Sequence, residues 1–250
     1  MPKILFPVLT LLFLSSCVTY QYFTVDSSQL PKNDQQAFVM DNDTMQLSYS
    51  FTGSGGPLTI TVLNKTDQPL VIDWNKSSLI CNDQSYLLAQ TNSTFAASTV
   101  NSRYGVTALS GTVSLTPGME IVPAKTKVTR STIDLDQTLA PGKMVIPDTA
   151  SKRLAQAPDG SQISYKGVNV DESGSPLKLR SYITFQIGSG NGTEFVEGHS
   201  FYIGKMMQTS YPPNNFYLYQ PTGNQFYFTF QKQQVITSSG TLLPPSALPR

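Results

Sequence analysis

The amino-acid sequence predicts an all-β protein: an antiparallel β-sandwich with Ig-like packing and two long loops. Apolar residues recur at every second position in several segments, which is the period of a strand with one buried face. Clusters of Gly, Pro, Asn and Asp separate these segments and are typical of turns. Only 13% of the residues are charged, whereas 10% are aromatic. A composition poor in helix formers and rich in Thr, Tyr and Phe favours strands.

The clearest alternation begins at residue 45. Two runs flank the glycine-rich turn at 53–57, and their apolar members are Met45, Leu47, Tyr49, Phe51, Leu58, Ile60 and Val62. This pattern predicts a hairpin with one buried face. After a turn at 64–67, Leu70, Ile72 and Trp74 share one strand face, so we expect Trp74 in the core. Asn82-Asp83 then separates two further apolar segments of an antiparallel meander.

Alternation is lost at residues 89–120 and again at about 137–175, and these stretches are the two predicted loops. Strand patterns return between and after them, at 127–135, 177–187, 195–207 and 226–235. In the last of these, Phe226, Phe228 and Phe230 face one side and Tyr227 faces the other. About nine or ten short strands without helical periodicity favour a sandwich.

The first residues have the pattern of an export signal. Lys3 precedes an apolar run from Ile4 to Leu14, which is shorter than the roughly 20 residues that a membrane-spanning helix needs. The run ends in Leu14-Ser15-Ser16-Cys17, which resembles the lipobox of bacterial lipoproteins. We therefore expect residues 1–16 to be removed and Cys17 to carry the lipid. An ordinary signal peptide with a chance cysteine, or an uncleaved anchor, is the alternative.

Four regions follow from these patterns. They are a signal peptide at 1–16, a lipidated tether and entry segment at 17–43, a β-sandwich domain at 44–236 and a disordered tail at 237–250. Val18 stands where many lipoproteins retained in the inner membrane have aspartate, so we expect the outer membrane. The first acidic residue is Asp26, which favours the periplasmic face over the cell surface.

The charge balance excludes some partners. The chain has 17 basic and 16 acidic residues, and removal of residues 1–16 takes away Lys3 alone, leaving 16 of each. A neutral chain with few charges has no overall electrostatic footprint for nucleic acid or for anionic membranes.

No cofactor or metal ion is predicted. Cys81 is the only thiol after Cys17, so no disulfide can form within the domain, and its apolar strand favours a buried, inert thiol. One histidine and one buried thiol cannot build a zinc site. Asp41-Asn42-Asp43 and Asp134-Leu135-Asp136 lack the glycine and glutamate of an EF-hand, so turn formation is preferred.

His199 and Ser200 begin like a nucleophile elbow, in the sequence Gly198-His199-Ser200-Phe201-Tyr202. Tyr202 stands where the closing glycine should be, and the surroundings predict a strand. Adjacent side chains of a strand point to opposite faces, so we expect His199 to be an ordinary strand residue.

Part of the chain resembles a known group. The run Ile60 to Trp74, with its turn Asn64-Lys65-Thr66-Asp67, resembles uncharacterised envelope lipoproteins of Bacteroidetes, as does the Tyr-rich start Cys17-Val18-Thr19-Tyr20-Gln21-Tyr22. The likeness covers about the first ninety residues. It implies membrane anchoring and a β fold, and it implies no activity. Asp43-Thr44-Met45 and Asp148-Thr149-Ala150 resemble the O-glycosylation sites described for such proteins.

Aromatic residues are dense near the C-terminus. Three loop tyrosines, Tyr211, Tyr217 and Tyr219, lie beside Pro212, Pro213 and Pro221. Amphipathic rings on proline-stiffened loops suit protein interfaces and sugar stacking, although packing against the end of the sandwich is the preferred interpretation. Glu194 and Glu197 are the nearest pair of carboxylates for glycoside hydrolysis, but solvated hairpin charge is the preferred interpretation of them.

The preferred hypothesis is a lipid-anchored envelope protein with a non-enzymatic binding or structural role. Its expected partner is another envelope protein or a glycan. A glycan- or peptidoglycan-acting hydrolase with carboxylates elsewhere is one alternative. Carbohydrate binding by the loop tyrosines is another.

We expect Cys17→Ala to move the protein out of the membrane fraction, because no other thiol near the cleavage site can carry a thioether-linked lipid. Labelling of cells with a fatty-acid analogue, followed by fractionation, measures both effects. Labelling that survives the substitution would contradict the assignment.

Overall fold

The computed structural model describes residues 18–89, 118–138, 146–147, 149–188 and 192–231. The predicted signal peptide, Cys17 and the predicted tail at 237–250 lie outside these residues. So do residues 90–117, which make up most of the first predicted loop.

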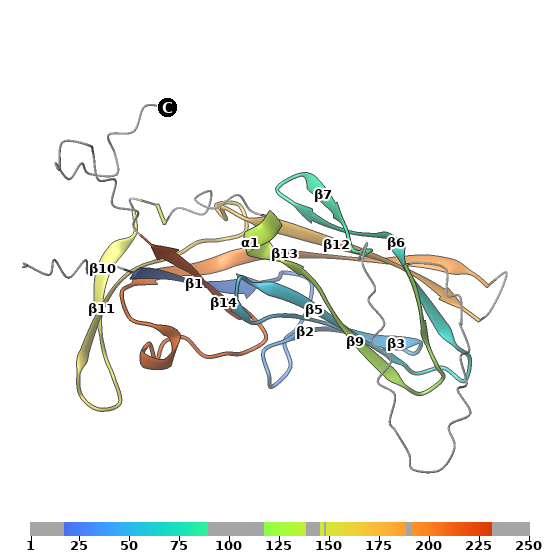
Figure 1. Cartoon of the computed structure of the whole chain (residues 1–250). Helices are drawn as coiled ribbons and strands as arrows, with labels where there is room; N and C mark the ends of the chain where they lie inside the picture. Colours follow the sequence, from blue (N-terminus) through green and yellow to red (C-terminus); the bar gives the residue numbers. More distant parts are fainter. Residues whose placement is uncertain (1–17, 90–117, 139–145, 148, 189–191, 232–250) are drawn as a thin grey trace, which may run out of the picture.

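Two curled β-sheets pack face to face (Figure 1). The main path of the ten-stranded sheet runs β4 (Gly53–Ser54), β14 (Gln225–Gln231), β1 (Val18–Asp26), β13 (Glu194–Thr209), β12 (Lys178–Ile187), β6 (Leu70–Cys81) and β7 (Gln84–Leu87). Off this path, β8 (Met119–Val122) pairs with β6, and β11 (Gln162–Asn169) joins β10 (Ser151–Gln156) to β13. The four-stranded sheet runs β2 (Phe38–Asp41), β3 (Met45–Phe51), β5 (Pro57–Asn64) and β9 (Lys127–Asp134).

Helical structure is confined to α1 (Leu135–Thr138) and the 3-10 turn η1 (Pro213–Asn215) within the described ranges. All strand pairs are antiparallel except the short β14–β4 pair. The predicted all-β antiparallel sandwich is confirmed, whereas Ig-like packing is not.

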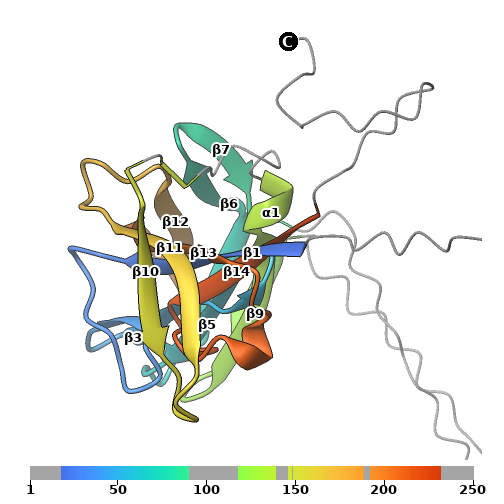
Figure 2. The same ribbon diagram turned by 90° about the vertical axis from the view of Figure 1, so that its left-hand side faces the viewer.

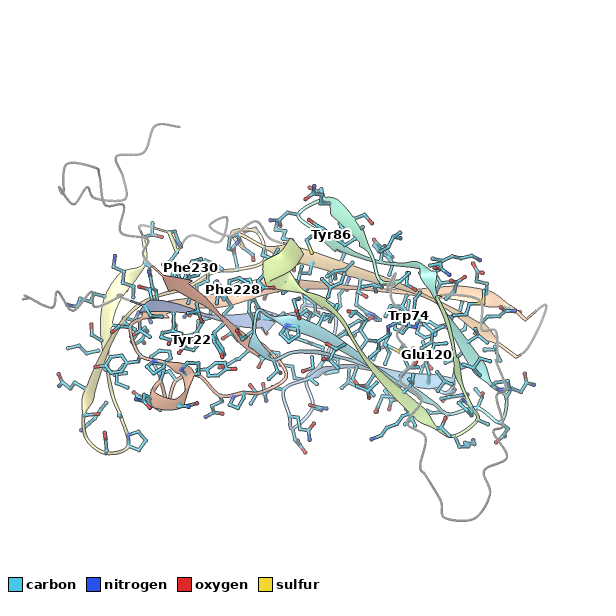
Figure 3. The ribbon with its side chains drawn as sticks, in the orientation of Figure 1. Tyr22, Trp74, Tyr86, Glu120, Phe228 and Phe230 are labelled. Atoms are coloured by element: carbon cyan, nitrogen blue, oxygen red, sulfur yellow. The ribbon has the colours of Figure 1, made fainter. Side chains whose placement is uncertain are left out.

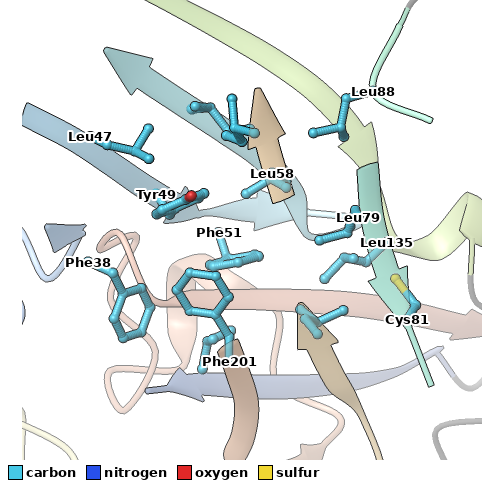
Figure 4. Close-up of a cluster of buried hydrophobic side chains, with 14 of the residues drawn as sticks. Phe38, Leu47, Tyr49, Phe51, Leu58, Leu79, Cys81, Leu88, Leu135 and Phe201 are labelled. Atoms are coloured by element: carbon cyan, nitrogen blue, oxygen red, sulfur yellow. The ribbon is translucent and has the colours of Figure 1, made fainter. Parts of the chain in front are cut away.

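The predicted hairpin at 45–62 is confirmed as β3 and β5, which pair from Met45–Asn64 to Phe51–Leu58. Every predicted inward residue of this hairpin is buried in the core between the sheets. Figure 4 shows this core, where Phe38, Tyr49 and Phe51 meet Phe201 of the opposite sheet. Burial of each such large side chain stabilises the folded state by about 1.5–3 kcal/mol.

Trp74 is a core residue, as predicted, with 1% of its surface exposed. Its indole N–H donates to Glu120 Oε2 at 2.8 Å (Figure 3). The Arg130 guanidinium lies 4.7 Å from the ring centre. The buried polar atom of the indole is therefore satisfied, and the ring links β6 of one sheet to β9 of the other.

Cys81 is buried, as predicted. The next two residues form the tight turn into β7, with Cys81 opposite Gln84. Asn82 and Asp83 both have positive φ, 44° and 67°. This is the backbone that a two-residue hairpin turn requires, and Asn and Asp tolerate it better than most residues.

The strands predicted at 177–187, 195–207 and 226–235 are confirmed as β12, β13 and β14. Their ends lie within two residues of the predicted ends wherever the structure describes them. Phe226 and Phe228 face the main core, and Phe230 packs against it (Figure 3). Tyr227 lies on the opposite face.

The predicted tether and entry segment at 17–43 is wrong for residues 18–26, which form β1 in the middle of the larger sheet, and for residues 38–41, which form β2 beside β3. β1 pairs with β14 on one edge and with β13 on the other. Tyr22 is buried on one face, while Phe23 and Val25 are buried on the other. A strand covered on both faces shows no polar alternation, which is why its sequence does not predict it.

The second predicted loop, at about 137–175, is also wrong in part, because it contains the β10–β11 hairpin. Only one face of this hairpin packs on the protein, and its other face is exposed and polar except for Leu154. A polar face combined with few large apolar residues hides the strand pattern in the sequence.

We expect Trp74→Ala to lower the free energy of unfolding by about 3–5 kcal/mol, because truncation of a buried aromatic residue leaves a cavity. Chemical unfolding measures the loss. Trp74 is the only tryptophan, so the native protein should also emit toward the blue and shift to the red on unfolding. A red-shifted native spectrum would contradict this prediction.

Candidate functional site

A pocket lies at the end of the sandwich where β1 begins. The turn of the β10–β11 hairpin forms one wall, and the loop that follows β13 forms the other. The cavity measures about 540 Å³ and is lined by Ala157, Pro158, Asp159, Ser161, Ile163, Tyr211, Asn214, Asn215 and Tyr217. This volume is within the range of small-ligand sites, about 300–1,000 Å³.

The loop wall is held by a second aromatic core on the outer face of the larger sheet. Tyr22 of β1 lies at its centre (Figure 3), with ring centroids 4.6 Å from Phe216 and 5.1 Å from Tyr219. The Tyr22 hydroxyl donates to the backbone oxygen of Tyr211 at 2.8 Å. Ile163 and Met207 complete the buried set. Strand β1 therefore positions the pocket loop by both packing and hydrogen bonding.

Burial raises the pKa of Tyr22 and of Tyr219 above the usual value. Both phenols therefore stay neutral at physiological pH and act as structural hydrogen-bonding groups. Neither is poised as a nucleophile, since a tyrosine nucleophile needs a lowered pKa or an adjacent base.

The three predicted loop tyrosines have different environments. Tyr219 is 7% exposed and packs edge-on against Tyr227 at 5.5 Å. Tyr211 and Tyr217 are partly exposed and line the pocket. The structure thus brings two of the three together at a cavity and places the third beneath it.

Polar groups accompany these two rings. Asp159 Oδ1 accepts the backbone N–H of Ser161 at 2.9 Å and its hydroxyl at 2.7 Å. These bonds hold the pKa of Asp159 below its usual value, so the carboxylate is charged at neutral pH. Asn214 and Asn215 are exposed and add amide donors and acceptors. The sequence pattern predicted no role for Asp159, Asn214 or Asn215, although Asn214-Asn215 lie between the predicted tyrosines Tyr211 and Tyr217.

A second hollow of about 550 Å³ lies over β12 and is lined in part by Asp83, Glu172 and Arg180. The Asp83 side chain is 93% exposed and pairs with Arg180 at 3.1 Å. Glu172 is exposed and accepts the Ser28 hydroxyl at 3.0 Å. A catalytic general acid lies in an environment shielded from water, whereas both of these carboxylates are exposed.

Glu194 and Glu197 do not form a facing pair. Three residues apart on β13, they point to opposite faces of the strand. Glu194 pairs with Lys76 at 2.5 Å, while Glu197 is partly buried, and burial raises its pKa. The geometry that two carboxylates need to flank one glycosidic bond is therefore missing here.

His199 is a buried strand residue, as predicted. Its Nδ1 lies 3.1 Å from the Tyr49 hydroxyl in the core. Ser200 follows it within β13, where its backbone N–H donates to Gln29 Oε1 at 2.7 Å. The strand-to-helix turn of a nucleophile elbow is not formed.

The described residues contain no group of three or more His, Cys, Asp and Glu side chains that could hold a metal ion. Asn42 Oδ1 instead accepts the backbone N–H groups of Thr44 and Met45, both at 2.9 Å, which confirms a turn. Thr44 is partly buried and Thr149 is exposed.

Searches of protein-family models, of curated proteins and of solved structures returned no match to this chain. In the ranges that the structure describes, neither helix has the length and apolar character to span a bilayer.

We expect Tyr219→Ala and Tyr217→Ala to differ in stability. Removal of the buried Tyr219 ring should lower the free energy of unfolding by about 3 kcal/mol. Removal of the partly exposed Tyr217 ring should lower it by less than about 1 kcal/mol. Paired denaturant unfolding curves measure the difference. Equal stability of the two variants would show that Tyr219 does not support the pocket loop.

Proposed function

We propose that this protein is a lipid-anchored component of the cell envelope with a non-enzymatic binding role. Acyl groups on Cys17 hold it on the periplasmic face of the outer membrane, and its ligand occupies the pocket lined by Tyr211 and Tyr217. The resemblance of its first ninety residues to envelope lipoproteins supports the anchoring. The pocket itself supports the binding role.

The ligand class we propose is a saccharide unit of an envelope glycan. Sugars present apolar C–H faces that stack on aromatic rings and hydroxyl groups that need paired donors and acceptors. Tyr211 and Tyr217 provide the rings, while Asn214, Asn215 and Asp159 provide the polar partners. The charged Asp159 disfavours an anionic ligand, which makes neutral or amino sugars the preferred class.

A binding role accounts for the carboxylates better than hydrolysis does. Asp83 and Asp159 are exposed, and Glu194 and Glu197 face opposite ways on one strand. The pocket holds a single carboxylate, whereas glycoside hydrolysis employs two in most enzyme families. A ligand bound in this pocket would therefore be released without chemical change.

We expect the full-length protein to bind envelope oligosaccharides, and Tyr217→Ala to weaken that binding about 3- to 10-fold, because ring stacking is worth roughly 1 kcal/mol. Titration calorimetry with purified peptidoglycan fragments and neutral oligosaccharides measures the affinity. Tyr182→Ala is the matched control, since Tyr182 is a partly exposed tyrosine on β12. If neither class of saccharide binds, or if the two variants bind equally, the pocket is not a glycan site.

A further inference from the structure

The anchor and the fold are joined without a spacer. The first residue of β1 is Val18, and consecutive Cα atoms are about 3.8 Å apart. A lipid on Cys17 therefore holds this end of the sandwich at the level of the lipid headgroups. Figure 1 shows that the β10–β11 hairpin lies at the same end, and Figure 2 looks onto that end, with the hairpin in front.

Strand register places two lysines near the anchor. Gln21 of β1 pairs with Gln208 of β13, Gln208 pairs with Lys166 of β11, and Lys166 pairs with Lys152 of β10. With strands about 4.8 Å apart and residues about 3.3 Å apart along each strand, the two lysines lie roughly 14–17 Å from Val18.

The two faces of the hairpin differ. Ile163 and Tyr165 face the second aromatic core. The other face presents Lys152, Lys166 and Leu154, and Leu154 is 65% exposed. Within the described ranges, no acidic side chain pairs with Lys152 or Lys166, although six other cations form ion pairs.

Lys152 and Lys166 stand directly opposite one another. Like charges in cross-strand positions destabilise a hairpin. An anionic surface would relieve this repulsion, and an exposed leucine between the charges suits the boundary between headgroups and acyl chains.

We infer that the outward face of the β10–β11 hairpin, formed by Lys152, Leu154 and Lys166, docks on the anionic headgroups of the membrane that holds the Cys17 lipid. The inference rests on the anchoring proposed above. The neutral total charge predicted no such footprint; the two exposed lysines of this face provide a local one, while Arg153 lies on the other face, opposite Tyr165. The acyl groups supply the attachment, and the lysines would set the orientation of the domain on the membrane surface.

This orientation leaves the pocket accessible. Ile163 lines the pocket and lies on the hairpin face opposite to the lysines. The hairpin would then separate the bound ligand from the bilayer.

Lysine reactivity tests the orientation. The acylated full chain is reconstituted on vesicles of phosphatidylcholine with 30% phosphatidylglycerol, and on pure phosphatidylcholine, and acetylation rates are read by mass spectrometry. We expect Lys152 and Lys166 to react at least fivefold more slowly on the anionic vesicles. Lys127 and Lys178 are the controls, because they are exposed lysines on β9 and β12, and they should react equally on both.

Equal rates for Lys152 and Lys127 on anionic vesicles, with the protein still acylated and bound, would overturn the docking and leave the anchoring intact. A Cys17 peptide without lipid in the same mass spectra would overturn the anchoring and this inference together.

Discussion

The burial of both faces of β1 is the constraint on which the rest of the molecule depends. Phe23 and Val25 pack into the core between the sheets, while Tyr22 forms the centre of the aromatic core outside them. One nine-residue strand therefore contributes to both cores, as does its neighbour β13, which places Met206 in the first and Met207 in the second. Because Tyr22 also bonds the backbone of Tyr211, the strand nearest the proposed lipid is the strand that positions the pocket.

Strand β13 extends this arrangement across the molecule. Its first half pairs with β12 within the sandwich, and its second half lies between β1 and β11. The β10–β11 hairpin widens the larger sheet at this end through the β11–β13 pair (Figure 1). The loop after β13 covers the outer face of the same region, where Phe216 and Tyr219 pack on Tyr22.

How far the sequence predicted the structure depends on how each strand is covered. β3, β5 and β6 each have one buried and one more exposed face, so apolar and polar residues alternate in their sequences. This alternation predicted the three strands and the core position of Trp74. β1 is covered on both faces, and the hairpin is mostly exposed, so neither alternates clearly. The sequence predicted Tyr211 and Tyr217 as candidates through their aromatic and proline context. It could not predict Asp159, because nothing local indicates that residues 157–161 meet residues 211–217 in space.

The β10–β11 hairpin has two faces, and the pocket proposed as a binding site and the surface proposed to meet the membrane lie on different ones. Its strands are short, and successive side chains point to opposite faces, so one element presents two separate surfaces. Ile163 and Tyr165 are needed on the inner face to support the pocket wall. Lys152, Leu154 and Lys166 have no such role in packing, since all three are exposed. Packing within the protein therefore does not account for the opposed lysine pair beside Leu154, and this is why we propose a membrane surface as its partner.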